Sequence, residues 1–349
     1  MINLTGLTLE ELEKFAVEQD EKVFRGRQLF SWIYEKNCCS FDGMSNISKS
    51  FRQKLQHIAK VGQVELYTKN ISPQSGTIKY LFSLYDNNFI ESVYIPEDKR
   101  RTLCISSQIG CALNCTFCAT GKMGFKRNLS AGEIVDQVLS VERDVGAELT
   151  NIVFMGMGEP FRNYDQVIKA AQLINHPDGI AVGARHIVIS TAGVADKIYR
   201  FADEGHRFRL AVSLNSAFNS KRIKLMPVTK KWDLESLLTA IKYYANKSKQ
   251  LPTIEYVLFD GLNDGHRDAK ELKKLLSKIP VKINIIPYNA TIPGYNRPDP
   301  EKVDQFIQWL LPLHAPVSVR WSKGDDINAA CGQLAGQIAQ KEKVNIDEL

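Results

Sequence analysis

Long apolar runs are absent from this 349-residue sequence. No stretch approaches the roughly 20 apolar residues that a helix needs to cross a bilayer, so a helical membrane protein is excluded. The segment 1–20 carries five acidic residues and has no apolar core flanked by basic residues, so an export signal is not expected there. These absences predict a cytoplasmic protein without a membrane partner.

The sequence also has little excess of charge of either sign. The sequence has 45 basic and 39 acidic residues, and a net charge of +6 is compatible with a polyanionic partner without requiring one. A dinucleotide-binding fingerprint is missing too, because Gly156-Met157-Gly158 lacks the third glycine and Pro160 follows closely. The length and the ordinary composition predict one large globular domain with smaller appendages.

Three of the seven cysteines, Cys111, Cys115 and Cys118, fall within eight residues. A tight loop with this spacing can direct all three thiols to a single point, which suits a metal ion or an iron–sulfur cluster. Structural zinc sites and electron-transfer clusters use four protein ligands, but no Cys or His occurs in the twenty residues after Cys118. Three ligands on a four-iron cluster leave one iron open for a substrate. The spacing therefore favours a catalytic cluster, with a structural zinc loop that borrows a distant ligand as the alternative.

This spacing, with Phe117 just before the last cysteine, resembles the signature loop of radical S-adenosylmethionine (radical SAM) enzymes. In that superfamily the open iron binds the amino and carboxylate groups of S-adenosylmethionine and passes it an electron. The resemblance therefore implies one [4Fe-4S] cluster held by Cys111, Cys115 and Cys118. It also implies S-adenosylmethionine as the second cofactor.

Hydrophobic periodicity divides the chain into four parts. Residues 1–60 have helical spacing and are expected to form a small accessory domain that contacts RNA. Residues 61–98 alternate with a period of two, which predicts a β-hairpin linker. Residues 99–335 are expected to form the core, and residues 336–349 a C-terminal tail.

Strands and helices alternate through the core. Strands are expected at 103–107, 151–155, 186–190, 208–213, 253–259, 282–286 and 316–321. Helices are expected at 131–143, 164–174, 194–203, 234–246, 269–276 and 302–311. Six or seven such units imply a parallel sheet that falls short of a closed eightfold barrel. We therefore predict an α/β fold with a partial (β/α)6 barrel, which the resemblance identifies as the radical SAM type, and an active site at the carboxyl ends of its strands.

Polar and small residues collect where these strands end. They are Gly158-Glu159-Pro160, Ser190, Ser213-Leu214-Asn215 and Asn289. Each alone is a common turn former or helix cap, but together at successive strand ends they indicate a binding site. The radical SAM resemblance implies that Gly158 and Glu159 receive the ammonium group of the cofactor. It implies that the others, including the backbone of Leu214, hold its ribose, carboxylate and adenine.

Among the other cysteines, Cys104 and Cys331 stand out. A lone cysteine is usually a small buried residue, but Cys331 lies in a polar loop, 324–334, that is expected to be flexible and to reach into the barrel mouth. Segments 104–111, 124–129 and 324–334 resemble the bacterial radical methyltransferases that methylate carbon 2 (C2) of an adenine in 23S ribosomal RNA and in transfer RNA. This resemblance covers nearly the whole chain.

Adenine C2 is electron-poor and cannot attack the methyl sulfonium of S-adenosylmethionine, whereas a thiolate can. The resemblance implies that one S-adenosylmethionine methylates Cys331 and that a second is cleaved to a 5′-deoxyadenosyl radical, so two are used per turnover. The radical removes a hydrogen from the S-methyl group, and the resulting carbon radical joins the adenine to Cys331. Release is implied to leave a disulfide between Cys104 and Cys331, with Glu91 as a proton acceptor.

The implied partners are 23S ribosomal RNA, before or during ribosome assembly, transfer RNA, and an electron donor such as a flavodoxin or ferredoxin system. The protein is expected to act as a monomer. Lys122, Lys126 and Arg127 lie beside the cysteine loop and are expected to steer the RNA backbone, and the target base must be single-stranded or flipped. Two alternatives stay open: methylation of carbon 8 (C8) of the same adenine, as in a related antibiotic-resistance family, and a non-catalytic, zinc-stabilised RNA-binding protein.

Overall fold

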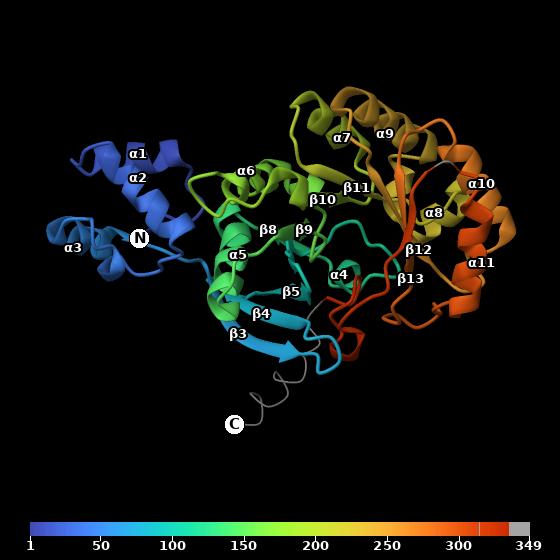
Figure 1. The fold of residues 1–349 in the computed structure, drawn as a ribbon, viewed down its shortest axis with the longest axis horizontal. Coiled ribbons are helices and arrows are strands. Elements are labelled where there is room, and N and C mark those ends of the chain that lie inside the picture. The colour runs from blue at the N-terminus through green and yellow to red at the C-terminus, as the bar shows by residue number, and fades with distance from the viewer. Residues whose placement is uncertain (314, 335–349) are drawn as a thin grey trace.

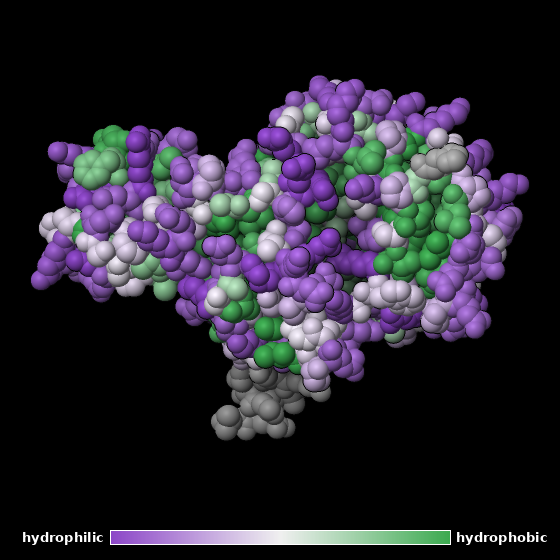
Figure 2. Space-filling model, in the orientation of Figure 1, coloured by the Kyte–Doolittle hydropathy of each residue, from purple (hydrophilic) through white to green (hydrophobic). Residues whose placement is uncertain are grey.

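The computed structural model describes residues 1–313 and 315–334, so the expected tail 336–349 lies outside the described residues. An N-terminal group of helices stands beside a larger part in which helices surround strands (Figure 1). Figure 2 shows a mostly hydrophilic face, with apolar residues gathered on the larger part near α8 (Asn219–Leu225) and α11 (Pro300–Leu310). None of the helices in the described ranges has the length and apolar character that a bilayer crossing requires.

The N-terminal part is helical, as its periodicity predicts. Its elements are β1 (Ile2–Asn3), α1 (Leu9–Glu18), α2 (Phe24–Phe30), the π-helical turn η1 (Ser31–Glu35), η2 (Phe41–Gly43), α3 (Lys49–Ile58) and β2 (Ala59–Lys60). Helix α1 begins with a capping box, in which the Thr8 hydroxyl accepts a hydrogen bond from Glu11 N–H and the Glu11 carboxylate accepts one from Thr8 N–H. Helices α1 and α2 pack closely because Gly26 has no side chain; a Cβ there would lie 2.4 Å from the Glu13 backbone.

Seven parallel strands form the core of a ten-stranded sheet. They are β6 (Arg100–Cys104), β9 (Asn151–Phe154), β10 (Ile187–Thr191), β11 (Arg209–Ser213), β12 (Thr253–Leu258), β13 (Lys282–Pro287) and β14 (Val317–Val319). The helices that follow the first six are α5 (Ala131–Val145), α6 (Tyr164–Asn175), α7 (Ala195–Asp203), α9 (Leu234–Ser248), α10 (His266–Leu276) and α11 (Pro300–Leu310). Six strand–helix units and a final strand confirm the predicted partial barrel, and Figure 1 shows the helices on its outside.

The expected hairpin is present as β4 (Ile78–Leu84) and β5 (Phe89–Glu97), and β5 pairs antiparallel with β6. A further strand, β3 (Val64–Ile71), extends this sheet and was not predicted, because most of its side chains are exposed and do not alternate cleanly. Strand β6 begins three residues earlier than expected. Its first residues pair with the end of β5, and the chain leaves the sheet after Cys104.

The register of this hairpin brings three chemically active side chains to one face. Val93 lies opposite Lys79 on one side and opposite Cys104 on the other, and Glu91 lies opposite Leu81. Side chains of opposed residues project from the same face of a sheet. Lys79, Glu91 and Cys104 therefore share a face.

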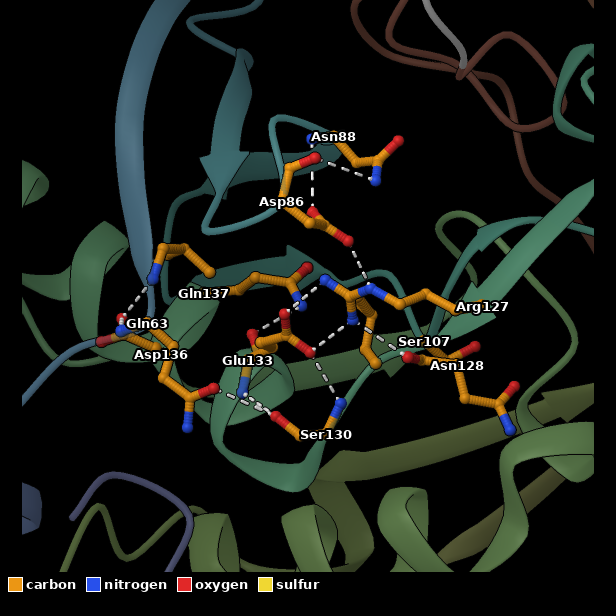
Figure 3. A network of polar contacts seen from close by, with 12 residues as sticks. Gln63, Asp86, Asn88, Ser107, Arg127, Asn128, Ser130, Glu133, Asp136 and Gln137 are labelled. Carbon is orange, nitrogen blue, oxygen red and sulfur yellow. Dashed lines mark hydrogen bonds and ion pairs between the residues drawn. The ribbon is translucent and has the colours of Figure 1, made fainter. Parts of the chain in front are cut away.

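Arg127 ties the hairpin to the core instead of facing solvent. It lies on β8 (Phe125–Asn128), and its Nε donates to Asp86 in the turn of the hairpin at 2.6 Å. Its two terminal nitrogens donate to both oxygens of Glu133 on α5, at 2.9 and 2.8 Å (Figure 3). The guanidinium group of Arg127 therefore has two carboxylate partners, and the contact with the RNA backbone expected for it stays a prediction.

Replacement of Arg127 by methionine is expected to lower the free energy of unfolding by about 2 kcal/mol, because Glu133 would stay buried without its cation. Urea unfolding followed by circular dichroism measures the change. Lys126→Met is the matched control, since Lys126 is exposed and donates to the neutral side chain of Asn88. Equal unfolding midpoints for the two variants would contradict the role of Arg127 in holding the hairpin to the core.

Candidate active site

The cysteine loop is closed at its base by a small antiparallel sheet that the sequence did not reveal. Strand β7 (Gln108–Gly110) pairs with β8, and Cys111 N–H donates to Gly124 C=O at 2.9 Å. Gly110 has φ +71°, and a Cβ there would lie 1.7 Å from the Gly124 oxygen, so no other residue fits. Helix α4 (Ala119–Lys122) follows Cys118 directly.

All three thiols border one cavity of about 180 Å³, which we call the cysteine-loop cavity. It also receives the predicted strand-end residues Gly158, Glu159, Ser190, Ser213, Asn215 and Asn289. Leu214 does not line it: its N–H donates to Glu255 C=O at 2.9 Å, and its C=O accepts from Arg222. The structure therefore brings together all the predicted strand-end positions except Leu214, whose backbone groups form hydrogen bonds with Glu255 and Arg222.

The three thiols share this cavity but are not placed as ligands of a single metal ion. In the described ranges no group of three or more His, Cys, Asp or Glu side chains is placed to hold a single metal ion. A four-iron cluster takes each thiolate on a different iron, so its ligands need only share a cavity. Burial raises the pKa of Cys111 to about 12 and also raises the pKa values of Cys115 and Cys118. Binding of a cluster to this loop must therefore release protons.

Glu159 is fixed at the end of β9 by backbone groups. Its carboxylate accepts hydrogen bonds from Ala192 N–H at 2.7 Å and from Phe161 N–H at 3.0 Å. Gly158, at φ +100°, passes so close to Gln108 that a Cβ would lie 2.5 Å from that side chain. Burial raises the pKa of Glu159 to about 7, opposed by these backbone hydrogen bonds. The carboxylate is thus held in place and titrates near neutral pH.

Asn289 supplies an unused acceptor in the same cavity. Its Oδ1 is buried and has no hydrogen-bond partner among the described residues, while its Nδ2 donates to Cys331 C=O at 3.3 Å. A buried acceptor without a partner is costly, so the site suits a ligand that carries donor groups. Three thiols, one fixed carboxylate and this open amide oxygen fit a [4Fe-4S] cluster with S-adenosylmethionine beside it.

A second cavity, of about 420 Å³, lies next to the first. Cys104, Arg320 and Cys331 all border it, and we call it the thiol-pair cavity. Cys331 lines both cavities, as does Met155. The Cys331 thiol therefore stands where the cysteine-loop cavity meets the thiol-pair cavity.

The loop that carries Cys331 is anchored, although its composition predicted flexibility. Gly332 C=O accepts from Ala119 N–H at 2.8 Å, and Leu334 C=O accepts from the Thr120 hydroxyl at 2.5 Å. These bonds attach it to the helix that follows Cys118. All seven cysteines are free thiols, so the disulfide that the resemblance implied for Cys104 and Cys331 is not present in this structure.

Arg320 is a residue that sequence reasoning missed. It directly follows β14, which ends at Val319, whereas the expected strand 316–321 placed it inside the strand. Its N–H pairs with Ile285 C=O at 2.9 Å, and its side chain borders the thiol-pair cavity. Burial raises the pKa of Cys104 to about 12, Cys331 adds to the rise, and Arg320 opposes it. Arg320 is therefore the cation that favours a thiolate in this cavity.

Glu91 is buried beside Lys79 and lines neither cavity. Their charged groups are 3.8 Å apart, and Glu91 Oε2 has no hydrogen-bond partner in the described ranges. Burial raises the pKa of Glu91, and Lys79 opposes the rise. Lys79 Nζ also donates to Asn328 C=O at 3.3 Å, so one ammonium group contacts both Glu91 and the loop of Cys331.

Comparison with known proteins agrees with this site. The family model "Ribosomal RNA large subunit methyltransferase N-terminal domain" matches residues 2–61, and the "Radical SAM superfamily" model matches residues 105–276. The latter match implies a [4Fe-4S] cluster and S-adenosylmethionine as cofactors.

Several relatives match this chain along nearly its whole length. The dual-specificity RNA methyltransferase RlmN of Geobacter sulfurreducens is 44% identical over 97% of this chain and 93% of its own length. The probable dual-specificity RNA methyltransferase RlmN of a Thermoanaerobacter species is 43% identical over 96% of this chain and 98% of its own. A radical SAM methyltransferase from Sphaerobacter thermophilus superimposes with a TM-score of 0.92 at 38% identity, over 95% of this chain and 99% of that one. The chain therefore belongs to the radical SAM RNA methyltransferases of the RlmN family.

Proposed function

We propose that this protein methylates C2 of an adenine in 23S ribosomal RNA and in transfer RNA, with Cys331 as the methyl carrier. One observation carries the proposal: Cys331 borders both the cavity of the three cluster cysteines and the cavity of Cys104. A thiol at this junction can receive a group from one side and deliver it to the other without a large movement of the chain.

A carrier thiol is needed because the substrate carbon cannot take the methyl group directly. Adenine C2 is electron-poor and cannot attack a methyl sulfonium, whereas a thiolate is a good nucleophile. When bound, the cofactors supply a methyl group and a hydrogen-abstracting radical, with two S-adenosylmethionine molecules used per turnover. Cys331 takes the methyl group, loses a hydrogen atom from it, and becomes joined through that carbon to the adenine.

Cys104 and Glu91 are proposed to complete the reaction. Release of the methylated base requires loss of the C2 proton and cleavage of the bond between the Cys331 sulfur and the methylene carbon, which takes up the proton of the Cys104 thiol. The adduct must also give up its unpaired electron, which returns to the electron-transfer system that supplied it. Glu91 is a buried carboxylate with an unused oxygen, so it can accept a proton. Cys104 shares the thiol-pair cavity with Cys331 and can attack its sulfur, which leaves a disulfide that a thiol reductant resets.

We propose that residues 1–60 form the RNA-contacting accessory domain, residues 61–98 a linker and residues 99–335 the catalytic core. Lys36, Lys49 and Lys54 are exposed on the helical part, where their charges can meet phosphates. A flavodoxin or ferredoxin system is the proposed electron donor, and a monomer the proposed state.

Anaerobic reconstitution followed by incubation with ribosomal and transfer RNA transcripts tests the function. Mass spectrometry of RNA digests is expected to find 2-methyladenosine. Detection of 8-methyladenosine would replace the C2 assignment with C8. Colourless protein that holds zinc and does not cleave S-adenosylmethionine would overturn the enzyme assignment in favour of a zinc-stabilised RNA-binding protein.

Binding of S-adenosylmethionine is expected to depend on the charge of Glu159. Its pKa is about 7, so it is ionised at pH 8 and mostly neutral at pH 6. An ionised carboxylate attracts the ammonium group of the cofactor, so the dissociation constant should be roughly tenfold larger at pH 6 than at pH 8. Equilibrium dialysis of the reconstituted protein measures it.

Glu159→Gln should bind weakly with little dependence on pH over this range. Glu142→Gln is the matched control, because burial also raises the pKa of Glu142 to about 7 but that residue lies on α5 and lines neither cavity. If Glu142→Gln removes the pH dependence and Glu159→Gln keeps it, the role assigned to Glu159 is wrong.

A further inference from the structure

Arg222 is a fully buried cation without a carboxylate partner. It lies on α8 (Asn219–Leu225), and its exposed fraction is 0%. No ion pair involves it within the ranges 1–313 and 315–334. Buried charges are rare in proteins unless an opposite charge compensates them. The missing anion therefore needs an explanation.

Neutral acceptors surround the guanidinium group. Nε donates to Leu214 C=O at 2.9 Å, one terminal nitrogen to the Thr229 hydroxyl at 2.7 Å, and the other to Ala192 C=O at 2.7 Å and Ser213 C=O at 3.2 Å. These carbonyls lie at or just beyond the ends of β10 and β11, and Ala192 and Ser213 line the cysteine-loop cavity. The contacts satisfy the donors but supply no negative charge.

The cysteine loop is the neighbour that can supply the charge. Thr116 N–H donates to Leu225 C=O at 2.9 Å, which joins the loop to the end of α8. Burial lowers the pKa of Arg222 to about 10, and Cys115 opposes this effect. Arg222 thus stays positive at neutral pH and interacts electrostatically with one of the three cluster cysteines.

We propose that Arg222 is the buried counter-charge of the [4Fe-4S] cluster and raises its reduction potential. The inference rests on the cluster that the radical SAM match implies, and it does not depend on the methylated position. A four-iron cluster with three thiolates is anionic, and reduction adds an electron. A fixed positive charge in a low-dielectric site favours the reduced form more than the oxidised one.

Redox titration followed by electron paramagnetic resonance tests the proposal without RNA. Arg222→Gln keeps an amide that can donate to the strand-end carbonyls but removes the charge, and Arg222→Lys keeps the charge. Arg222→Gln is expected to lower the midpoint potential by at least about 59 mV, a tenfold shift in a one-electron equilibrium, whereas Arg222→Lys should stay close to wild type.

Lys224→Met is the matched control, since it removes one positive charge from the exposed face of the same helix, where solvent screens it. The proposal is overturned if Arg222→Gln keeps the wild-type potential, or if Lys224→Met shifts it equally. Loss of iron from both Arg222 variants in a folded chain would assign Arg222 to assembly of the loop instead. If Arg222→Gln lowers the midpoint potential as expected but the protein yields 8-methyladenosine, this inference stands and only the C2 assignment is overturned.

Discussion

Replacement of Cys331 by alanine is expected to reduce RNA methylation by roughly three orders of magnitude, because the carrier that holds the methyl group is lost. Cleavage of S-adenosylmethionine should continue, because the three cluster cysteines and the strand-end residues of the cysteine-loop cavity are unchanged. Chromatography of 5′-deoxyadenosine and mass spectrometry of the RNA measure the two outcomes in one reaction. Methylation without Cys331 would show that the carrier mechanism is wrong.

Cys39→Ala provides the control for this experiment. Cys39 is an exposed free thiol that lines neither cavity, so its removal should leave both cleavage and methylation at wild-type levels. Loss of methylation in both variants would point to a general effect of thiol removal, such as poor cluster assembly, and the iron content of each variant would identify it.

Replacement of Cys104 by alanine is expected to give the second large effect, accumulation of RNA joined covalently to Cys331. The adduct forms before Cys104 acts, and its resolution requires a thiol in the cavity that Cys104 and Cys331 share. A denaturing gel of labelled RNA should show a protein-dependent band that protease digestion removes. Mass spectrometry should place the modification on Cys331.

The double variant Cys104→Ala, Cys331→Ala is the control, and it should give no band. A normal product yield from Cys104→Ala alone would remove this residue from the resolution step. Burial holds the pKa of Cys104 at about 12, so its thiol is protonated at rest, and Arg320 is the group that opposes this effect.

The strongest sequence predictions concern local patterns. The spacing of Cys111, Cys115 and Cys118, and the alternation of strands and helices, depend on residues close together in the chain. The alternation therefore predicted the partial barrel correctly, and the three cysteines border one cavity. The rule that active sites gather at the carboxyl ends of strands also predicted that Glu159 and Asn289 lie in one site, and both line the cysteine-loop cavity.

The residues that the sequence did not reveal make contacts with residues far away in the chain. Lys79 reaches Asn328, which is 249 positions away, and Arg222 contacts carbonyls from two neighbouring strands. No local pattern predicts such contacts. The same limit applies to Arg127, whose basic neighbourhood suggested a phosphate site but gave no sign of Asp86, which lies against it from a distant turn.

The hydrogen bonds from Ala119 to Gly332 and from Thr120 to Leu334 attach the loop of Cys331, which lines both cavities, to the helix that follows the cysteine loop. The peptide that carries Cys331, the proposed methyl carrier, is also a wall of the cysteine-loop cavity, the compartment in which the radical is proposed to form. A displacement of that peptide toward Cys104 must therefore loosen the compartment at the same moment.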